Sequence, residues 1–225
     1  MNDTAVDTVN KGNLWKSHTR KAFTSMATEG VIGLGAVALA IIGLSNVVPE
    51  ILMAIACIAV GVAFAFEGGA ISARYSTLIE LDERYSKSDA FARWGGMGTL
   101  FITGAFAIGL GILSLIGIVP LVLVPVAAIV LGAGLIVGSY TNYRLSVREA
   151  RHYEEFKSRE NVVKETTHAS AGIQFAIGCG AVVLGIVALN GVYVLGLSLI
   201  AMLGIGAANA LTGAMLGGRM SSIFK

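Results

Sequence analysis

Residues 103–144 read TGAFAIGLGILSLIGIVPLVLVPVAAIVLGAGLIVGSYTNYR and contain no charged residue before the closing arginine. A short break at residues 117–120, GIVP, divides the stretch into two halves of about twenty residues. Because an α-helix rises about 1.5 Å per residue, each half is long enough to cross a hydrocarbon core about 30 Å thick. The stretch therefore predicts a transmembrane helical hairpin.

The composition of the whole chain agrees with this prediction. Of the 225 residues, 55% are hydrophobic and 13% are charged, and the mean hydropathy is +0.77. Soluble domains carry about 25% charged residues, so this chain is expected to be an integral membrane protein. The 29 glycines favour close packing of helices. A net charge of +2 gives no reason to expect nucleic acid as a partner. The two cysteines, Cys57 and Cys179, lie in apolar runs and are predicted to be small buried side chains.

Similar hairpins precede and follow the central one. We therefore predict an all-α integral membrane protein with six transmembrane helices in three tandem hairpins and with helical cytoplasmic extensions. The first 29 residues lack the apolar core of a cleavable signal peptide, so the first transmembrane helix is expected to direct insertion. The predicted segments, in order, are an N-terminal cytoplasmic or interfacial segment (1–29), hairpin 1 (30–72), a cytoplasmic helical linker (73–94), hairpin 2 (95–142), a second cytoplasmic helical linker (143–169), hairpin 3 (170–216) and a cytoplasmic tail (217–225).

The distribution of basic residues predicts the orientation. Segments 1–29, 73–94, 143–169 and 217–225 contain four, four, six and two Lys or Arg residues, which together are all 16 in the chain. The turns of the three hairpins contain none. Because cytoplasmic loops of membrane proteins are enriched in Lys and Arg, we expect both termini and both linkers to be cytoplasmic, in a cell inner membrane.

An internal repeat of about 72–74 residues connects the hairpins. Residues 110–117 (LGILSLIG) and 184–191 (LGIVALNG) are identical at five of eight positions, and residues 36–43 align with them more loosely. On the returning helices the aligned segments are 131–134, 203–206 and, weakly, 60–63. Repeats in the same orientation are related by an axis along the membrane normal. A six-helix bundle with pseudo-threefold symmetry is the simplest arrangement, and chance similarity of glycine-rich apolar sequence is the alternative.

The chain resembles the HdeD family of six-helix bacterial inner-membrane proteins, which are associated with acid stress. The resemblance lies in residues 36–49, 111–120 and 185–191 and in the returning helices: a Gly-x-x-Leu run, a short turn that often contains Pro, and a glycine-containing helix, three times over. The linkers are long for that family, and the third turn has no Pro. The resemblance implies an architecture and a stress-response role, and it supplies no catalytic residues.

Glu67 is the only ionisable residue expected well inside a membrane segment, which makes it a functional candidate. Arg74 lies seven residues later, two turns along the same helical face. Two interpretations remain open. Glu67 is either a proton- or cation-responsive carboxylate packed against another helix, or an interfacial residue that pairs with Arg74 or reaches water.

Thr103, Gln174 and Asn209 are the other polar residues expected at membrane depth. Each can form a hydrogen bond across a helix pair, worth roughly 0.6–2 kcal/mol. Glu67, Gln174 and Asn209 either converge on a central polar site or have separate structural roles.

No metal site, cofactor or catalytic group is predicted. Two Glu-x-x-His motifs, Glu149 to His152 and Glu165 to His168, have the spacing used in di-iron bundles. On one continuous helix, however, an offset of sixteen residues would turn the motifs to opposite sides, about 160° apart. We therefore interpret this linker as a charged helical segment. No phosphate-binding loop and no pairing of a nucleophile with a base is evident.

Three functional classes remain. The first is a non-catalytic, HdeD-like protein with a stress-response or membrane-organising role. The second is an accessory or scaffold subunit of a larger membrane complex, which the apolar residues in the linkers favour. The third is a small transporter or channel. The expected partners are the lipid bilayer and either further copies of the chain or other membrane subunits.

Overall fold

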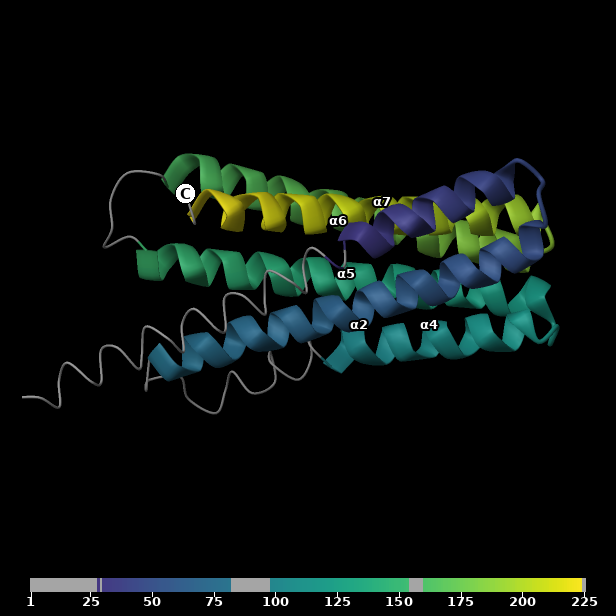
Figure 1. The fold of residues 1–225 in the computed structure, drawn as a ribbon, viewed down its shortest axis with the longest axis horizontal. Helices are drawn as coiled ribbons and strands as arrows, with labels where there is room; N and C mark the ends of the chain where they lie inside the picture. Colours follow the sequence, from purple (N-terminus) through teal and green to yellow (C-terminus); the bar gives the residue numbers. More distant parts are fainter. Residues whose placement is uncertain (1–27, 29, 82–97, 154–159, 224–225) are drawn as a thin grey trace, which may run out of the picture.

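The structure is a computed structural model that describes residues 28, 30–81, 98–153 and 160–223, and the side chains of residues 28, 30–69, 98–141, 143 and 171–214. The regular structure of the described residues is entirely helical, as predicted (Figure 1). The six helices are Gly30–Leu44, α2 (Pro49–Leu81), α4 (Thr99–Leu115), α5 (Pro120–Tyr153), α6 (Glu160–Leu189) and α7 (Val194–Ile223).

Four of these helices contain stretches long and apolar enough to cross a membrane: Pro49–Gly69, Pro120–Thr141, Ala171–Leu189 and Val194–Ala214. The other two, Gly30–Leu44 and Thr99–Leu115, are shorter than the twenty residues expected from the sequence. The second of them has 17 residues, so its length is about 26 Å. The glycines at positions 95, 96 and 98 weaken helix formation before Thr99.

Three short turns join consecutive helices at one end of the molecule (Figure 1). All three have the same backbone conformation. A residue with positive φ occurs at Asn46 (66°), Gly117 (88°) and Gly191 (84°), and a second occurs two residues later in each turn. The N–H group of the first donates to the carbonyl three residues earlier at 2.9–3.0 Å in each turn.

These turns define the register of the internal repeat. The helices that follow them, α2, α5 and α7, begin at Pro49, Pro120 and Val194, which are 71 and 74 residues apart. Two of the sequence alignments were therefore wrong. Residue 36 is equivalent to residue 107, one turn away from the position aligned above, and Gly132 is equivalent to Gly206, whereas the sequence alignment paired it with residue 204. Leu-Gly strings recur within each helix, so identity alone placed the segments in the wrong turn.

With this register, burial repeats as well. We refer to α2, α5 and α7 as the returning helices and to Gly30–Leu44, α4 and α6 as the leading helices. Every buried position among the described side chains of α2 is also buried at the equivalent position of α5 and of α7. The returning helices contact one another. In α2 these positions are Met53, Ala54, Ala56, Cys57, Val60, Gly61, Ala63, Phe64, Glu67 and Gly68.

Glycines bring each leading helix against the returning helix of the preceding hairpin. A Cβ atom added to Gly104 of α4 would lie 2.5 Å from the carbonyl oxygen of Gly61 in α2. The same relation joins Gly178 of α6 to Gly132 of α5, at 2.8 Å. Without a Cβ on either partner the backbones can approach this closely.

The third such contact closes the bundle. A Cβ atom on Gly33, in the first helix, would lie 2.8 Å from the carbonyl oxygen of Gly206 in α7, the last helix. Gly33, Gly104 and Gly178 are equivalent positions of the repeat. The three hairpins therefore pack as a closed ring, with pseudo-threefold symmetry in both sequence register and contacts.

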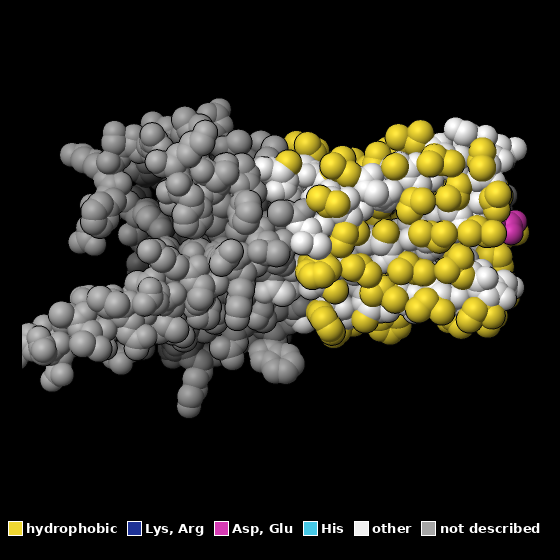
Figure 2. Space-filling view, in the orientation of Figure 1, with side chains coloured by type: hydrophobic (Ala, Val, Ile, Leu, Met, Phe, Trp, Pro, Cys, Tyr) yellow, Lys and Arg dark blue, Asp and Glu magenta, His cyan; other side chains and the backbone are white. Residues whose placement is uncertain are grey.

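The outside of the described bundle is apolar. Hydrophobic side chains cover most of the face in Figure 2, and large exposed hydrophobics such as Phe101, Phe106 and Val183 are more than half exposed. At the end opposite the turns, α2 and α5 continue for twelve residues past their apolar stretches, to Leu81 and Tyr153. We call the segments 70–81, 142–153, 160–170 and 215–223 the helical extensions.

Candidate functional site

Glu67 lies on the inner face of α2, near the end of the apolar stretch that is farthest from the turns. Its exposed fraction is 4%. It lies 18 residues after Pro49, which corresponds to about 27 Å of helix. The helix continues without interruption through Arg74, so the two residues share a face of the backbone as predicted. The side chain of Arg74 lies outside the described part, and the proposed pairing remains a prediction.

Gln174 forms the interhelical hydrogen bond that the sequence suggested. Its Nε2 donates to Oγ1 of Thr212 at 2.7 Å, joining α6 to α7. The Thr212 hydroxyl donates in turn to the carbonyl oxygen of Ala208 at 2.9 Å. Both residues are buried, with exposed fractions of 3% and 6%. In the repeat, Thr212 occupies the position of Glu67 and Gly138, so this polar pair lies at the same level of the bundle as Glu67.

Asn209 lies one turn before Thr212 on α7 and is wholly buried. The expectation that its amide bonds across a helix pair was wrong, because neither Oδ1 nor Nδ2 has a hydrogen-bond partner in the structure. Its equivalents in the other repeats are Phe64 and Leu135. Asn209 is therefore a polar substitution at a position that is otherwise filled by a large apolar side chain.

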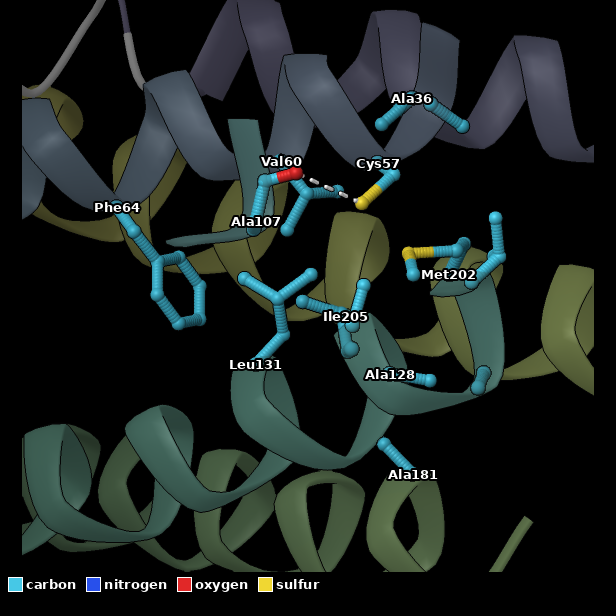
Figure 3. Packing of buried hydrophobic residues seen from close by; sticks show 14 of the residues in the cluster. Ala36, Cys57, Val60, Phe64, Ala107, Ala128, Leu131, Ala181, Met202 and Ile205 are labelled. Atoms are coloured by element: carbon cyan, nitrogen blue, oxygen red, sulfur yellow. Dashed lines mark hydrogen bonds between the residues drawn. The ribbon is translucent and has the colours of Figure 1, made fainter. Parts of the chain in front are cut away.

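An apolar layer separates this polar level from the turns. Val60, Leu131 and Ile205 occupy equivalent positions of the three returning helices and are wholly buried. Figure 3 shows the three side chains facing one another in the interior, with Phe64 one turn farther along α2. Thr103 is also buried, beside Gly134, where an added Cβ would lie 2.6 Å from its Cγ2. The polar residues at the level of Glu67 thus lie on one side of a packed aliphatic layer.

The sequence analysis missed several buried polar groups. The thiol of Cys57, which is free, donates to the carbonyl oxygen of Ala107 at 3.2 Å and links α2 to α4 (Figure 3). Thr212, the partner of Gln174, was also missed. Ser114 and Ser198 are buried with no hydrogen-bond partner for their hydroxyls. These residues are isolated within apolar runs, and only the helix rotations, which the sequence does not give, show that they face inward.

The two Glu-x-x-His motifs lie on different helices. The α5 helix ends at Tyr153, after the first motif, and α6 begins at Glu160, before the second. The assumption of one continuous helix was therefore wrong, and the argument from a 160° rotation no longer applies. The side chains of both motifs lie outside the described part. Among the residues that the structure does describe, no three His, Cys, Asp or Glu side chains form a group that could hold a metal ion.

No protein-family model, curated protein or solved structure matches this chain. The site therefore has to be interpreted from its own residues: a buried carboxylate, a buried amide without a partner, and a hydrogen-bonded Gln–Thr pair, all at one end of the returning helices.

Proposed function

We propose that this chain is a non-catalytic, multi-pass membrane protein whose three hairpins all cross a bacterial inner membrane. The turns would then lie outside, and both termini and the helical extensions would lie in the cytoplasm. Two observations support this arrangement. The exposed surface of the described bundle is apolar, and the residues before, between and after the hairpins contain every Lys and Arg of the chain.

The two short leading helices are compatible with six crossings. Gly30–Leu44 and Thr99–Leu115 end at the same turns as the longer helices and pack along them. A helix shorter than the hydrocarbon core is accommodated by local thinning of the bilayer or by reorientation of its flanking residues, at a cost of fractions of a kcal/mol per Å.

A membrane-organising or scaffold role, similar to that expected for an HdeD-like stress protein, is the function that the geometry favours. The observation that carries it is the combination of a packed core with the helical extensions. Val60, Leu131 and Ile205 fill the interior at mid-depth. Beyond the apolar stretches, twelve residues of helix extend α2 and α5 by about 18 Å. Such extensions hold a fixed surface for partners at a set distance from the bilayer.

A role as an accessory subunit is the second candidate, and the same extensions favour it. Tyr75, Leu78 and Tyr153 lie on segments that continue past the apolar stretches. In an accessory subunit these residues would pack on a partner protein. A transporter is less favoured because the aliphatic layer interrupts a polar path in this conformation.

Site-directed labelling tests the topology. Cysteine would be placed at Asn46, Val119 or Asn190 in the turns, or at Ser86 in the first linker, in a chain whose two native cysteines are replaced by alanine. A membrane-impermeant maleimide added to intact cells should label the three turn positions, and should label position 86 only after the cells are opened. Labelling of any turn only in opened cells would contradict the proposed orientation.

Purification in mild detergent tests the role. A scaffold that acts alone should yield a complex containing only this chain, whereas an accessory subunit should retain a second protein in a fixed ratio. Cation or proton flux in proteoliposomes above that of protein-free vesicles would contradict both and favour the transporter.

A further inference from the structure

The buried amide of Asn209 needs partners that the described residues do not provide. Its exposed fraction is 0%, and neither Oδ1 nor Nδ2 has a hydrogen bond. Leaving such a group unsatisfied costs about 1–3 kcal/mol per polar group. We infer that Asn209, together with Glu67, forms a binding site for a small monovalent cation that keeps part of its water shell. This inference goes beyond the proposed scaffold role and does not depend on it.

The repeat relates the position of Asn209 to that of Glu67. On α2, the ring of Phe64 lies over Gly134 of α5, because a Cβ added there would be 3.0 Å from Cε2 of Phe64. The equivalent relation one step around the ring places Asn209 of α7 beside Ala63 of α2. These two helices are in contact. Glu67 lies one turn beyond Ala63 on the same helical face.

The neighbouring polar pair is already satisfied. Thr212 accepts a hydrogen bond from Gln174 and donates one to Ala208. The pair therefore forms a wall of the site, and Asn209 is the buried side chain there with unused hydrogen-bonding capacity. Glu67 has interactions of its own within the structure. A carboxylate has about four lone-pair positions, so it can also accept a cation.

The donor atoms determine the class of ligand. A carboxylate and an amide oxygen are hard oxygen ligands, which suit alkali and alkaline-earth cations. Glu67 supplies one negative charge, so a monovalent cation is neutralised, whereas a divalent cation would leave a net positive charge in a medium that solvates it poorly. The Nδ2 group of Asn209 cannot bind a cation, but it can donate to a water molecule that the cation retains. Na⁺ and K⁺ therefore fit this site.

Equilibrium binding of ²²Na⁺ and of ⁸⁶Rb⁺, as a K⁺ analogue, to the purified full-length protein in detergent tests the inference. Choline chloride keeps the ionic strength constant, and the pH is fixed. The wild-type protein should bind one of the two ions saturably, at about one per chain. At ten times its dissociation constant, that ion should raise the Tm by about 3–6 °C relative to choline.

Four variants identify the ligands. Asn209→Leu, which copies Leu135 of the second repeat, should weaken binding about tenfold or more, because loss even of groups that only support ligands costs 10–100-fold. Glu67→Gln should abolish binding, and Asn209→Asp, which keeps an oxygen ligand, should retain it. Gln174→Leu copies Leu100 and serves as the matched control that should bind as the wild type does.

Two results would overturn the inference. One is the absence of saturable ²²Na⁺ or ⁸⁶Rb⁺ binding by the folded wild-type protein, which would leave only a structural water at Asn209. The other is unchanged binding by Glu67→Gln or by Asn209→Leu. Because the wild-type measurement decides the first, failure of a variant to fold does not protect the inference.

Discussion

At Gly104 the absence of a side chain determines how closely two helices can pack. An added Cβ would lie 2.5 Å from the carbonyl oxygen of Gly61 and 3.1 Å from the amide nitrogen of Ala65. Both are backbone atoms, so neither can turn away as the end of a side chain could. In a lipid environment helix association depends on such close packing, because burial of apolar surface from lipid gives little driving force.

We therefore expect Gly104→Ala to destabilise the folded protein by about 1–3 kcal/mol, the usual cost of overpacking. Gly109→Ala is the matched control on the same helix, since nothing lies within 4 Å of its added Cβ. It should be neutral or slightly stabilising, because alanine favours helix more than glycine does. Unfolding in mixed micelles by increasing SDS would measure both. Equal destabilisation by the two substitutions would contradict the assigned contact.

Residues also show where sequence reasoning reaches its limit. The pattern of isolated polar residues in apolar runs identified Glu67, Gln174 and Asn209, and the structure buries all three. It could not show that Gln174 has a partner and that Asn209 has none. That difference depends on how α6 and α7 are rotated relative to each other, and a single polar residue per helix does not define a rotation.

The turns are the elements that set the repeat. In each turn the first positive-φ position is Asn46, Gly117 or Gly191, residue types that tolerate the left-handed region. The second is Val48, Val119 or Tyr193, with φ of 39–41°. Bulky and β-branched residues rarely adopt such values, so the sequence gave no reason to expect them there. The recurrence of this conformation in all three turns indicates that the hairpin geometry as a whole imposes it.

Substitutions at Gly117 test the backbone requirement directly. No atom lies within 4 Å of its added Cβ, so only the φ of 88° matters. Gly117→Val should destabilise by about 1–2 kcal/mol, the cost of a left-handed conformation. Gly117→Asn, which copies Asn46 of the first turn, should cost clearly less. Thermal unfolding in detergent would compare the two, and an equal loss for both variants would exclude φ as the cause.

Element positions were easier to predict than their alignment. The breaks at Asn46, Pro120 and Asn190 lie at or next to the turns in the structure, because Gly, Pro and Asn interrupt otherwise uniform apolar runs. The prediction that the second helix of a hairpin continues past its apolar stretch is confirmed for α2, which ends at Leu81. The register between repeats was wrong in two places, since Leu and Gly are too frequent in this chain to identify a unique match.

For the whole molecule, the contact between Gly33 and Gly206 makes the three hairpins a ring in which no interface is special. Composition and charge pattern were sufficient to predict an all-helical chain with apolar helices in pairs. They also favoured pseudo-threefold symmetry as the simplest arrangement. The pairing of particular helices could not be predicted, because Gly-rich faces occur on all six.

A circular permutant tests ring closure. A chain that begins at residue 95, runs to Lys225 and continues through a short Gly-Ser linker into residues 1–94 keeps every hairpin intact. It should fold with a Tm within about 4 °C of the wild-type protein, a shift that corresponds to 1–2 kcal/mol at this size. A chain lacking residues 1–44 is the control and should be strongly destabilised, because it leaves the glycine face of α7 uncovered. If the permutant were destabilised as much as the truncated chain, the closed ring would be wrong.

Ring closure also has a consequence for the order of events during synthesis. The helix that is made first packs against the helix that is made last, and Val194 follows Leu44 by 150 residues. At a translation rate of about 5–20 residues per second, α7 begins to leave the ribosome about 8–30 s after the first helix is complete. Throughout that interval the Gly33 face has no permanent neighbour. The nascent chain must therefore wait beside the translocon or in lipid with its oldest helix still unmatched, and the protein reaches its final form only when translation is almost finished.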